Sequence, residues 1–270
     1  MFCCTTLAIL AATIAAVPAT AADCTREYLQ AAADGYVAAQ RAGDASLATA
    51  LSATASGYTE NFKRPVGKPI LSRPLGVDFS RSILDTTACA TYTEVVVTDP
   101  AHPYVIGSQI HWAVAPNNNN NSTAATPVKI ETLVTDAGDW LFNATGTLHY
   151  SSRESWDPIP EAQRDTRDAI RAAGDAYCDL FNDKTVKVPW GMPCQRLEGG
   201  VYVGRGLPTD SCNVGVPSGV ALTNRRYVVD EVLGTVSIFL TFGGSPDSHQ
   251  FRLEKGKLRF VHTITVTGRD

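Results

Sequence analysis

Two stretches of the chain carry apolar residues at helical spacing, and each is followed by runs of residues that favour strands. Within each stretch the apolar positions recur at i, i+3 and i+4, which predicts an amphipathic helix. They are Leu29, Ala32, Ala33, Tyr36 and Val37 in the first stretch and Ile170, Ala173, Tyr177, Leu180 and Phe181 in the second. Thr25 and Pro160 precede these stretches and supply helix start signals.

Segments rich in Thr, Val, Ile and Tyr follow each predicted helix and predict strands. They cover residues 83–98, 104–114 and 128–135 in the first half and 227–242, 250–254 and 257–267 in the second. Leu233-Gly234 and Lys255-Gly256 predict turns between strands. One helix followed by an antiparallel meander in each half indicates an α+β fold. The polar, proline-bearing segment 151–159 is the predicted linker between domains 23–150 and 160–270.

Three segments of the first half recur in the second half in the same order, which predicts a tandem duplication. Residues 81–85 and 226–230 both read Arg-x-[Ile/Val]-[Leu/Val]-Asp. The other two matches are 31–36 with 171–177 and 130–134 with 261–265. The last of these places Glu131 of the first half at the position of His262 in the second half.

The N-terminus predicts a secretory signal peptide over residues 1–22. An apolar run at 7–17 is too short to span a bilayer, Pro18 interrupts it, and small residues follow at 19–22. No later segment reaches transmembrane length, so we expect no membrane contact after the signal is removed. The 270-residue chain has a formal net charge of −4, which argues against a general nucleic-acid binder. We therefore expect a secreted, extracellular protein.

Cysteine usage agrees with export into an oxidising compartment. Cys3 and Cys4 leave with the signal peptide, and the remaining cysteines lack the spacing of a zinc cluster. One bridge in each half is the most economical pairing, and it leaves one buried free thiol. The pairs are Cys24–Cys89 and Cys194–Cys212, and the free thiol is Cys178. The spacing alone does not exclude other pairings.

Three N-x-[Ser/Thr] sequons predict N-glycosylation, at Asn120, Asn121 and Asn143. The first two lie in the polar run 117–121, which has no apolar residue to bury. Such a run is typical of an exposed loop. A signal peptide makes these sequons usable, because glycosylation requires export.

His262 is the one titratable residue in an apolar row on the last predicted strand. The row has a spacing of two residues and comprises Leu258, Phe260, His262, Ile264 and Val266. A histidine in such a row is either a general acid/base in a water-poor pocket or a core residue whose ring nitrogens are hydrogen-bonded to a neighbouring residue. Both interpretations remain open from the sequence.

Asp230 and Arg226 are the candidates to orient the His262 ring. They lie four residues apart, on one face of a predicted strand. Asp230 could hold the imidazole in one tautomer, and Arg226 could set the pKa of the carboxylate or bind an anionic substrate group. The same spacing recurs at Arg81 and Asp85, which also fits a structural salt bridge in each half.

A second group of candidates would line the pocket as substrate-binding residues. Trp190, Arg196 and Glu198 lie in segment 189–200, among Pro, Gly and a cysteine that we expect to be bridged. Such a segment forms either the lip of a pocket or a stapled loop with the tryptophan as its small core. Tyr177 projects from the second helix and could either contact a ligand or pack against the sheet.

Signatures of other catalytic classes are absent from the sequence. It contains no GxSxG elbow, no GxGxxG motif after a strand and no Walker loop. The histidines do not show HExxH or HxH spacing. We therefore expect no cofactor and no metal.

Four segments resemble a family of secreted fungal proteins that carry a SnoaL-like, or nuclear transport factor 2-like, domain of unknown function. They are residues 81–86, 138–146, 188–200 and 210–219. The resemblance implies two tandem cones, each a long N-terminal helix packed on a curved antiparallel sheet around an internal pocket. It also implies an intramolecular pseudo-dimer of the two domains. The superfamily includes cyclases, isomerases, dehydratases and binding proteins, so the fold does not select an activity.

These observations leave three functional hypotheses. The first is a cofactor-free acid/base enzyme (an isomerase, cyclase, lyase or hydrolase) that acts on a small, partly apolar molecule through His262, Asp230 and Arg226. The second is an extracellular protein that binds such a molecule without catalysis, and the third is a surface-interaction protein. Convergence of the three residues in an open cavity favours the enzyme, whereas a packed interior favours the other two.

Protein secreted by a eukaryotic host should start near Asp23 and carry N-linked glycans, because the signal peptide exposes the sequons to glycosylation. Treatment with an N-glycosidase should then lower the intact mass measured by mass spectrometry. A mass that does not change, together with retention of Met1, would contradict the expectation of export.

Overall fold

The computed structural model describes residues 24–51, 57–113 and 125–268. The predicted signal peptide and the sequons at Asn120 and Asn121 lie outside these residues. The first half contains helices α1 (Arg26–Ala42), α2 (Ser46–Leu51) and α3 (Ala144–Ser151), the 3-10 turn η1 (Ile70–Ser72), and strands β1 (Tyr58–Glu60), β2 (Phe79–Asp85), β3 (Ala90–Val97), β4 (Tyr104–Ala113) and β5 (Thr126–Thr135). The second half contains the 3-10 turn η2 (Glu161–Gln163), helix α4 (Arg167–Asp179), and strands β6 (Trp190–Glu198), β7 (Val201–Tyr202), β8 (Leu222–Asp230), β9 (Thr235–Phe242), β10 (Ser245–Glu254) and β11 (Lys257–Thr265).

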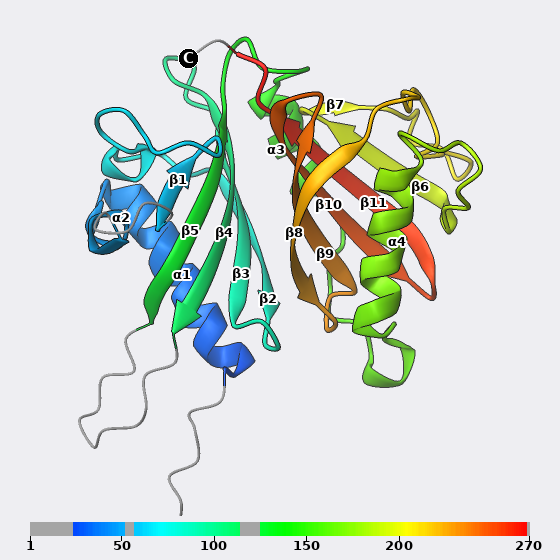
Figure 1. Cartoon of the computed structure of the whole chain (residues 1–270), viewed down its shortest axis with the longest axis horizontal. Coiled ribbons are helices and arrows are strands. Elements are labelled where there is room, and N and C mark those ends of the chain that lie inside the picture. Colours follow the sequence, from blue (N-terminus) through cyan, green and yellow to red (C-terminus); the bar gives the residue numbers. More distant parts are fainter. Residues whose placement is uncertain (1–23, 52–56, 114–124, 269–270) are drawn as a thin grey trace, which may run out of the picture.

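The strands form two sheets, one from each half of the chain (Figure 1). The order is β1-β5-β4-β3-β2 in the first sheet and β7-β6-β11-β10-β9-β8 in the second. One pair in each sheet is parallel, β1 with β5 and β6 with β11, and the other pairs are antiparallel. The α+β class is therefore confirmed, and apart from β7 the two sheets have the same strand order.

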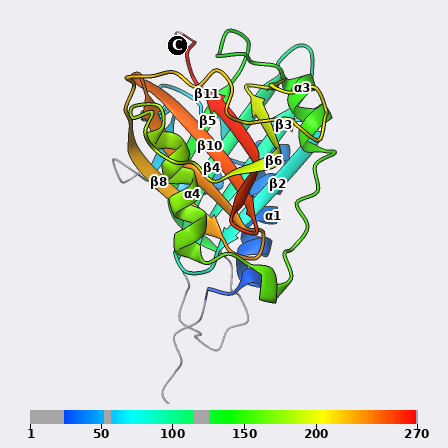
Figure 2. The ribbon, with the colours of Figure 1, turned by 90° about the vertical axis from the view of Figure 1, so that its right-hand side faces the viewer.

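Helices α1 and α4 each start at a threonine cap and cover the outer face of one sheet (Figure 2). Thr25 Oγ1 accepts a hydrogen bond from Tyr28 N at 3.2 Å, and Thr166 Oγ1 accepts one from Ala169 N at 3.3 Å. The predicted start at Pro160 is wrong, because the chain after this proline forms η2 before the cap is reached. Among the described residues, none of the helices has the length and apolar character needed to cross a bilayer.

One predicted strand and one predicted loop need correction. The predicted strand 83–98 is a hairpin, because β2 ends at Asp85 and β3 starts at Ala90. Its turn contains Cys89 at a φ of 46°, a left-handed conformation that β-branched strand formers avoid. The prediction of a rigid loop over segment 189–200 is wrong, because this segment contains β6, a strand that pairs in parallel with β11. The turns predicted at Leu233-Gly234 and Lys255-Gly256 are confirmed.

The two sheets pack against each other through the faces that α1 and α4 leave uncovered, and we call this contact the seam. The apolar side chains at the seam come from both halves and include Ile83, Tyr92, Val105, Leu133, Val228, Phe239 and Ile264. The Tyr92 ring meets the Phe239 ring edge-on, with their centroids 6.0 Å apart. The chain therefore forms four layers in the order helix, sheet, sheet, helix (Figures 1 and 2).

Asp85, at the end of β2, joins the first half to the second. It forms a bidentate ion pair with Arg167 at the start of α4, with 2.7 Å between each pair of atoms. It also accepts a hydrogen bond from Val229 N of β8 at 2.8 Å and two from the amides of its own turn, Thr87 and Ala88. The carboxylate is fully buried, and its donors come from both halves of the chain.

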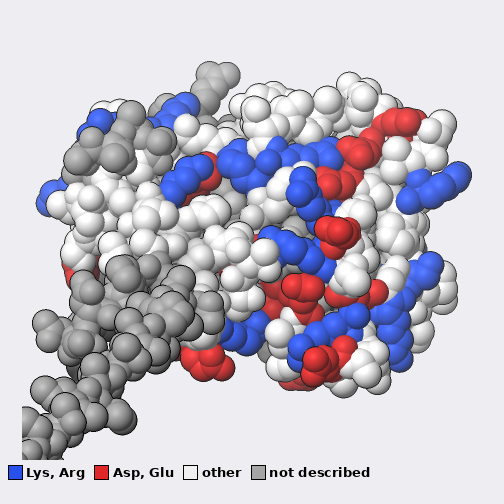
Figure 3. Space-filling model, turned by 60° about the horizontal axis from the view of Figure 1, so that its bottom comes forward, with Lys and Arg blue, Asp and Glu red and all other residues white. Residues whose placement is uncertain are grey.

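Asp230, at the end of β8, makes the reciprocal connection. It pairs with Arg26 at the start of α1 (2.8 Å) and accepts a hydrogen bond from Leu84 N of β2 (2.9 Å). Val232 N and Leu233 N of its own turn complete its contacts. We call Asp85 and Asp230 with their partners the two aspartate clamps. Figure 3 turns the bottom of the view of Figure 1 forward and shows acidic and basic side chains intermingled on that face.

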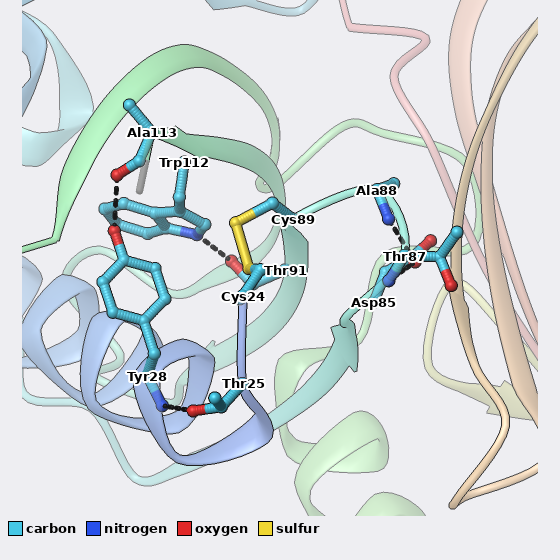
Figure 4. Close-up of a disulfide and its surroundings, with 10 residues drawn as sticks. All are labelled: Cys24, Thr25, Tyr28, Asp85, Thr87, Ala88, Cys89, Thr91, Trp112 and Ala113. Atoms are coloured by element: carbon cyan, nitrogen blue, oxygen red, sulfur yellow. Dashed lines mark hydrogen bonds between the residues drawn. A yellow bond between two sulfur atoms is a disulfide. The ribbon is translucent and has the colours of Figure 1, made fainter. Parts of the chain in front are cut away.

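Both predicted disulfides are present. Cys24–Cys89 joins the start of α1 to the β2–β3 turn, and Cys194–Cys212 ties β6 to the loop after β7. Cys178 is free and buried, as predicted. Figure 4 shows that the Cys24–Cys89 bridge and Asp85 hold the same turn, so a covalent link and an aspartate clamp reinforce one another there.

Replacing Asp230 with alanine should lower the free energy of unfolding by about 3 kcal/mol, because Arg26 and three backbone amides lose their acceptor. Urea unfolding measures this loss. Asp34→Ala is the matched control, since Asp34 is exposed on α1 and should change stability little. Equal losses in the two variants would contradict the structural role of the clamp.

Candidate functional site

His262, the predicted catalytic residue, lies on β11 at the seam with only 4% of its surface exposed. Its Nε2 is 2.7 Å from Glu154 Oε2, and its Nδ1 is 3.5 Å from Glu94 Oε2. Glu94 comes from β3 of the other sheet, and Glu154 follows α3. Both ring nitrogens are therefore directed at carboxylates, from two different parts of the chain.

Arg81 completes a buried group of charges around the histidine. Its guanidinium lies 3.7 Å from Glu94 and 3.6 Å from Glu154, which is longer than a hydrogen bond but close enough for strong charge attraction. Its central carbon lies 4.1 Å from the centre of the Trp156 ring, and Trp156 Nε1 donates to Glu154 at 2.9 Å. We call Arg81, Glu94, Glu154, Trp156 and His262 the seam cluster.

His262 and Glu94 of the seam cluster are both charged at neutral pH. Burial alone would lower the pKa of His262, but the carboxylates of Glu154 and Glu94 outweigh it and raise this pKa to about 9. Burial alone would raise the pKa of Glu94, but its hydrogen bond to His262 and the charges of His262 and Arg81 hold this pKa at about 2. His262 is therefore a protonated partner of two carboxylates at neutral pH, and it has no free basic nitrogen.

The structure does not bring Asp230 or Arg226 to His262. Asp230 is engaged in its clamp with Arg26, and Arg226 Nε lies 3.0 Å from Glu131 Oε1 instead. The expected convergence of the three residues is therefore wrong. The reason is that strand ends and strand centres meet different partners at the seam: Asp230 reaches the facing backbone, whereas His262 reaches carboxylates of β3 and the segment after α3.

The salt bridges expected within one strand are not formed either. Asp85 pairs with Arg167 rather than Arg81, and Asp230 pairs with Arg26 rather than Arg226. The two arginines of the repeated motif bind other carboxylates instead: Arg81 lies next to Glu94 and Glu154, and Arg226 lies next to Glu131. Arg226 lies over the Phe62 ring at 4.2 Å and next to Glu131, which also binds Lys129 at 2.7 Å.

Tyr177, Trp190, Arg196 and Glu198 do come together, on the α4 side of the second sheet. The rings of Tyr177 and Trp190 are 5.7 Å apart in an edge-on arrangement, and Arg196 Nη1 donates to Tyr177 Oη at 3.3 Å. Arg196 also forms an ion pair with Glu198, which accepts a hydrogen bond from Trp140 Nε1. Tyr177 and Arg196 are buried, so this group forms packed structure rather than the lip of a pocket.

A cavity of about 410 Å³ lies beside the seam cluster. It is lined by Tyr150, Arg153, Glu154, Gln195, Tyr202, Gly204, Arg205 and Gly206. The rings of Tyr150 and Tyr202 are stacked, with centroids 4.6 Å apart and planes inclined by 19°. Glu154 thus connects the two features, because it binds His262 and also lines the cavity.

One wall of this cavity is a loop with a fixed shape. Asp210 accepts hydrogen bonds from Tyr202 Oη at 2.7 Å and from the amides of Arg205, Gly206 and Leu207. The disulfide Cys194–Cys212 ties the end of the loop to β6. The Arg205 side chain is exposed and has no hydrogen-bond or ion-pair partner among the residues that the structure describes. The loop therefore fixes the backbone of Arg205 and leaves its guanidinium without a partner among the described residues.

Sequence reasoning missed most of this site. Glu154 and Trp156 lie in the segment interpreted as a linker, and Tyr150 and Tyr202 carry no motif. The available signal was the unusual mixture of charge and tryptophan in that linker, which a purely connecting segment does not need. Within the described ranges, no group of three or more His, Cys, Asp or Glu side chains could hold a metal ion.

Residues 163–265 match a family model described as a domain of unknown function (DUF8021). The match covers α4 and the second sheet, and it includes the segments 188–200 and 210–219 that carried the resemblance. Segments 81–86 and 138–146 lie outside it. No curated protein and no solved structure matches the chain. The match is similarity over the second half only, and it assigns no chemistry to the cavity.

The stabilising effect of His262 should disappear as the pH rises. The pKa of His262 is about 9 in the folded protein and 6.5 as an ordinary value, so the protonated ring stabilises fully below pH 6.5 and progressively less up to about pH 9. Replacing it with glutamine should cost on the order of 3 kcal/mol near pH 6 and much less near pH 9.5.

Urea unfolding of wild type and His262→Gln across this pH range measures the difference. His102→Gln is the control, because His102 is exposed and should give a small difference at every pH. A His262→Gln effect that stays constant or grows with pH would show that the ring is neutral in the folded protein.

Proposed function

We propose that the protein is a secreted, non-catalytic binding protein for a small, partly apolar anion, which occupies the cavity beside the seam cluster. The observation that carries the proposal is the free Arg205 guanidinium on a fixed loop next to the stacked Tyr150 and Tyr202 rings. The two disulfides and the predicted signal peptide support an extracellular location.

We also propose that the chain is a tandem pair of SnoaL-like units that pack as an intramolecular pseudo-dimer. The support is the shared strand order of the two sheets, each with a capped helix on its outer face. The reciprocal pairs Asp85–Arg167 and Asp230–Arg26 further support two related halves, because each half supplies the same kind of group to the other.

Binding is a better account than acid/base catalysis because the candidate base is already occupied. A general base needs a free nitrogen near the operating pH, whereas both His262 nitrogens face carboxylates and the pKa is raised to about 9. The carboxylate of Glu154 is equally engaged, by His262 and by Trp156 Nε1. These contacts fix the cavity wall and leave neither His262 nor Glu154 free to act as a general base.

The charges around the cavity favour a planar anion. The negative charge of Glu154 is offset by protonated His262 and by Arg81. The positive charges of Arg153 and Arg205 therefore make the electrostatic potential in the cavity positive. Arg153 has one partner, the carbonyl of His149, and its remaining donors are available. Guanidinium groups bind carboxylates in a bidentate manner, and tyrosine rings favour flat apolar surfaces. We therefore assign the ligand to the class of small aromatic carboxylates.

Titration calorimetry with benzoate, 4-hydroxybenzoate and indole-3-acetate tests this assignment. Arg205→Gln should weaken binding about tenfold or more, because it removes a charge-assisted hydrogen bond. Arg41→Gln removes the same charge from an exposed position on α1 and should leave the affinity unchanged. The neutral analogue benzyl alcohol should bind much more weakly than benzoate.

Either of two results would reject the proposal. One is that no aromatic carboxylate binds at millimolar concentration. The other is that Arg205→Gln and Arg41→Gln bind equally well, which would place the ligand away from this loop.

A further inference from the structure

Asn143 is the predicted glycosylation site that falls within the described residues, and it ends a turn held against the β6–β7 hairpin. Its backbone N donates to Gly199 O at 2.7 Å. A Cβ atom at Gly199 would collide with the carbonyl oxygen of Trp140, and one at Gly200 would collide with that of Asn143. The hairpin and turn 139–143 are therefore in close backbone contact, which fixes the backbones of Trp140 and Asn143 relative to each other.

The Asn143 side chain keeps its amide nitrogen available for a sugar. Its Oδ1 caps α3 by accepting a hydrogen bond from Gly146 N at 2.8 Å. The residue is exposed, and its Nδ2 has no hydrogen-bond partner among the described residues. Glycosylation joins Nδ2 to the anomeric carbon of the first sugar, breaks the bond from that carbon to the pyrophosphate of a lipid-linked oligosaccharide, and releases one Nδ2 proton with the lipid pyrophosphate. The amide oxygen takes no part in this exchange, so the cap of α3 is compatible with a glycan.

Trp140 presents an apolar surface three residues before Asn143. The residue is 49% exposed, and the one polar atom of its ring, Nε1, donates to Glu198 Oε1 at 3.0 Å. Glu198 is itself paired with Arg196, so the ring is held at its polar edge. The surface that this ring offers to a partner is therefore carbon.

Two further exposed apolar side chains neighbour this ring. Leu141 follows Trp140 in the turn, at a φ of 48° that a leucine rarely adopts. Val201 is the strand partner of Glu198 across the hairpin, so these two side chains share one face. We call Trp140, Leu141 and Val201 the turn patch. Apolar side chains gathered on a surface indicate a contact that covers them.

We propose that the N-linked glycan on Asn143 lies back over the turn patch, with its first sugar rings packed on the Trp140 indole. Pyranose rings carry C–H groups that pack on the carbon surface of an aromatic ring and leave water there. The geometry favours this occupant because the glycan is attached three residues away on the same fixed turn, which gives it a high effective concentration at the patch. The inference rests on the proposed export of the chain and is independent of the proposed binding of aromatic carboxylates.

A double-mutant cycle measures the coupling between the glycan and the ring. Thr145→Ala abolishes the sequon and leaves the capping amide of Asn143 in place, and Thr145→Ser keeps the sequon as the matched control. Each is made with and without Trp140→Ala in the full chain, which is expressed in a eukaryotic host and unfolded in urea. Loss of the glycan should raise the unfolding equilibrium constant about fivefold where Trp140 is present and leave it unchanged where Trp140 is replaced.

Oxidation of Trp140 by hydroxyl radicals reports directly whether the ring is covered. Its rate, followed by peptide mass spectrometry, should be lower by about twofold or more in wild type than in Thr145→Ala, because the glycan shields the exposed half of the residue. Met192 is the internal control, since it is exposed and lies six residues before Glu198 on β6, about 20 Å along the strand. Met192 should oxidise at the same rate in both proteins.

Three results would overturn the proposal. The first is an Asn143 that carries no glycan, as mapped on peptides of the total protein from cells and medium. The second is equal oxidation of Trp140 in wild type and Thr145→Ala, and the third is a loss of stability that is the same with and without Trp140.

Benzoate titration of Thr145→Ala separates this inference from the ligand site. No residue of the turn patch lines the cavity at Arg205, so benzoate affinity should stay at the wild-type value. Failure of benzoate to bind either protein would reject the ligand assignment, and the oxidation and unfolding results would still decide the position of the glycan.

Discussion

The two sheets can close on each other only because two buried carboxylates are satisfied by donors from the opposite half. Asp85 ends β2 and Asp230 ends β8, and each would be costly to bury without partners. Arg167 and a backbone amide of β8 satisfy the first, while Arg26 and a backbone amide of β2 satisfy the second. The starts of both outer helices and the ends of the edge strands β2 and β8 are thereby fixed by the same contacts.

This constraint determines where the other polar groups of the seam lie. With strand ends held together, the strand centres of the two sheets must bury their side chains against each other. Most of these are apolar, and the charged ones are grouped so that unlike charges meet, as in the seam cluster around His262. The cavity beside the seam cluster forms at the margin of the seam, where the loop 203–212 passes over the sheet edge. The position of the cavity beside the seam cluster is therefore a consequence of how the halves meet.

Local features were predictable from the sequence because they depend on neighbouring residues. The helical stripes around Tyr36 and Tyr177 and the turn at Leu233-Gly234 are of this kind. The two disulfides followed instead from the division of the chain into halves, with one bridge in each. The repeat also identified Asp85 and Asp230 as matched positions. Their partners were not predictable, because periodicity shows which face a side chain occupies and carries no information about the sheet opposite that face.

The environment of His262 shows the same limit. Its apolar strand face indicated a buried ring, which the structure confirms. Its partners Glu94 and Glu154 lie 168 and 108 residues away in sequence, and no spacing rule connects them. The hypothesis of Asp230 and Arg226 as orienting groups used the nearest matched charges, and it failed because the seam pairs residues between halves rather than along one strand.

Native-state hydrogen exchange of the Leu84 and Val229 amides tests the central claim most directly, because each donates to an aspartate of the other half. If the clamps hold the halves together until the chain unfolds, both amides should exchange only through global unfolding. Their exchange free energies should then equal those of core amides in both sheets, such as Ile110 of β4 and Phe251 of β10. Faster exchange at Leu84 and Val229 than at either core amide would show that the halves separate while each remains folded, and would contradict the account.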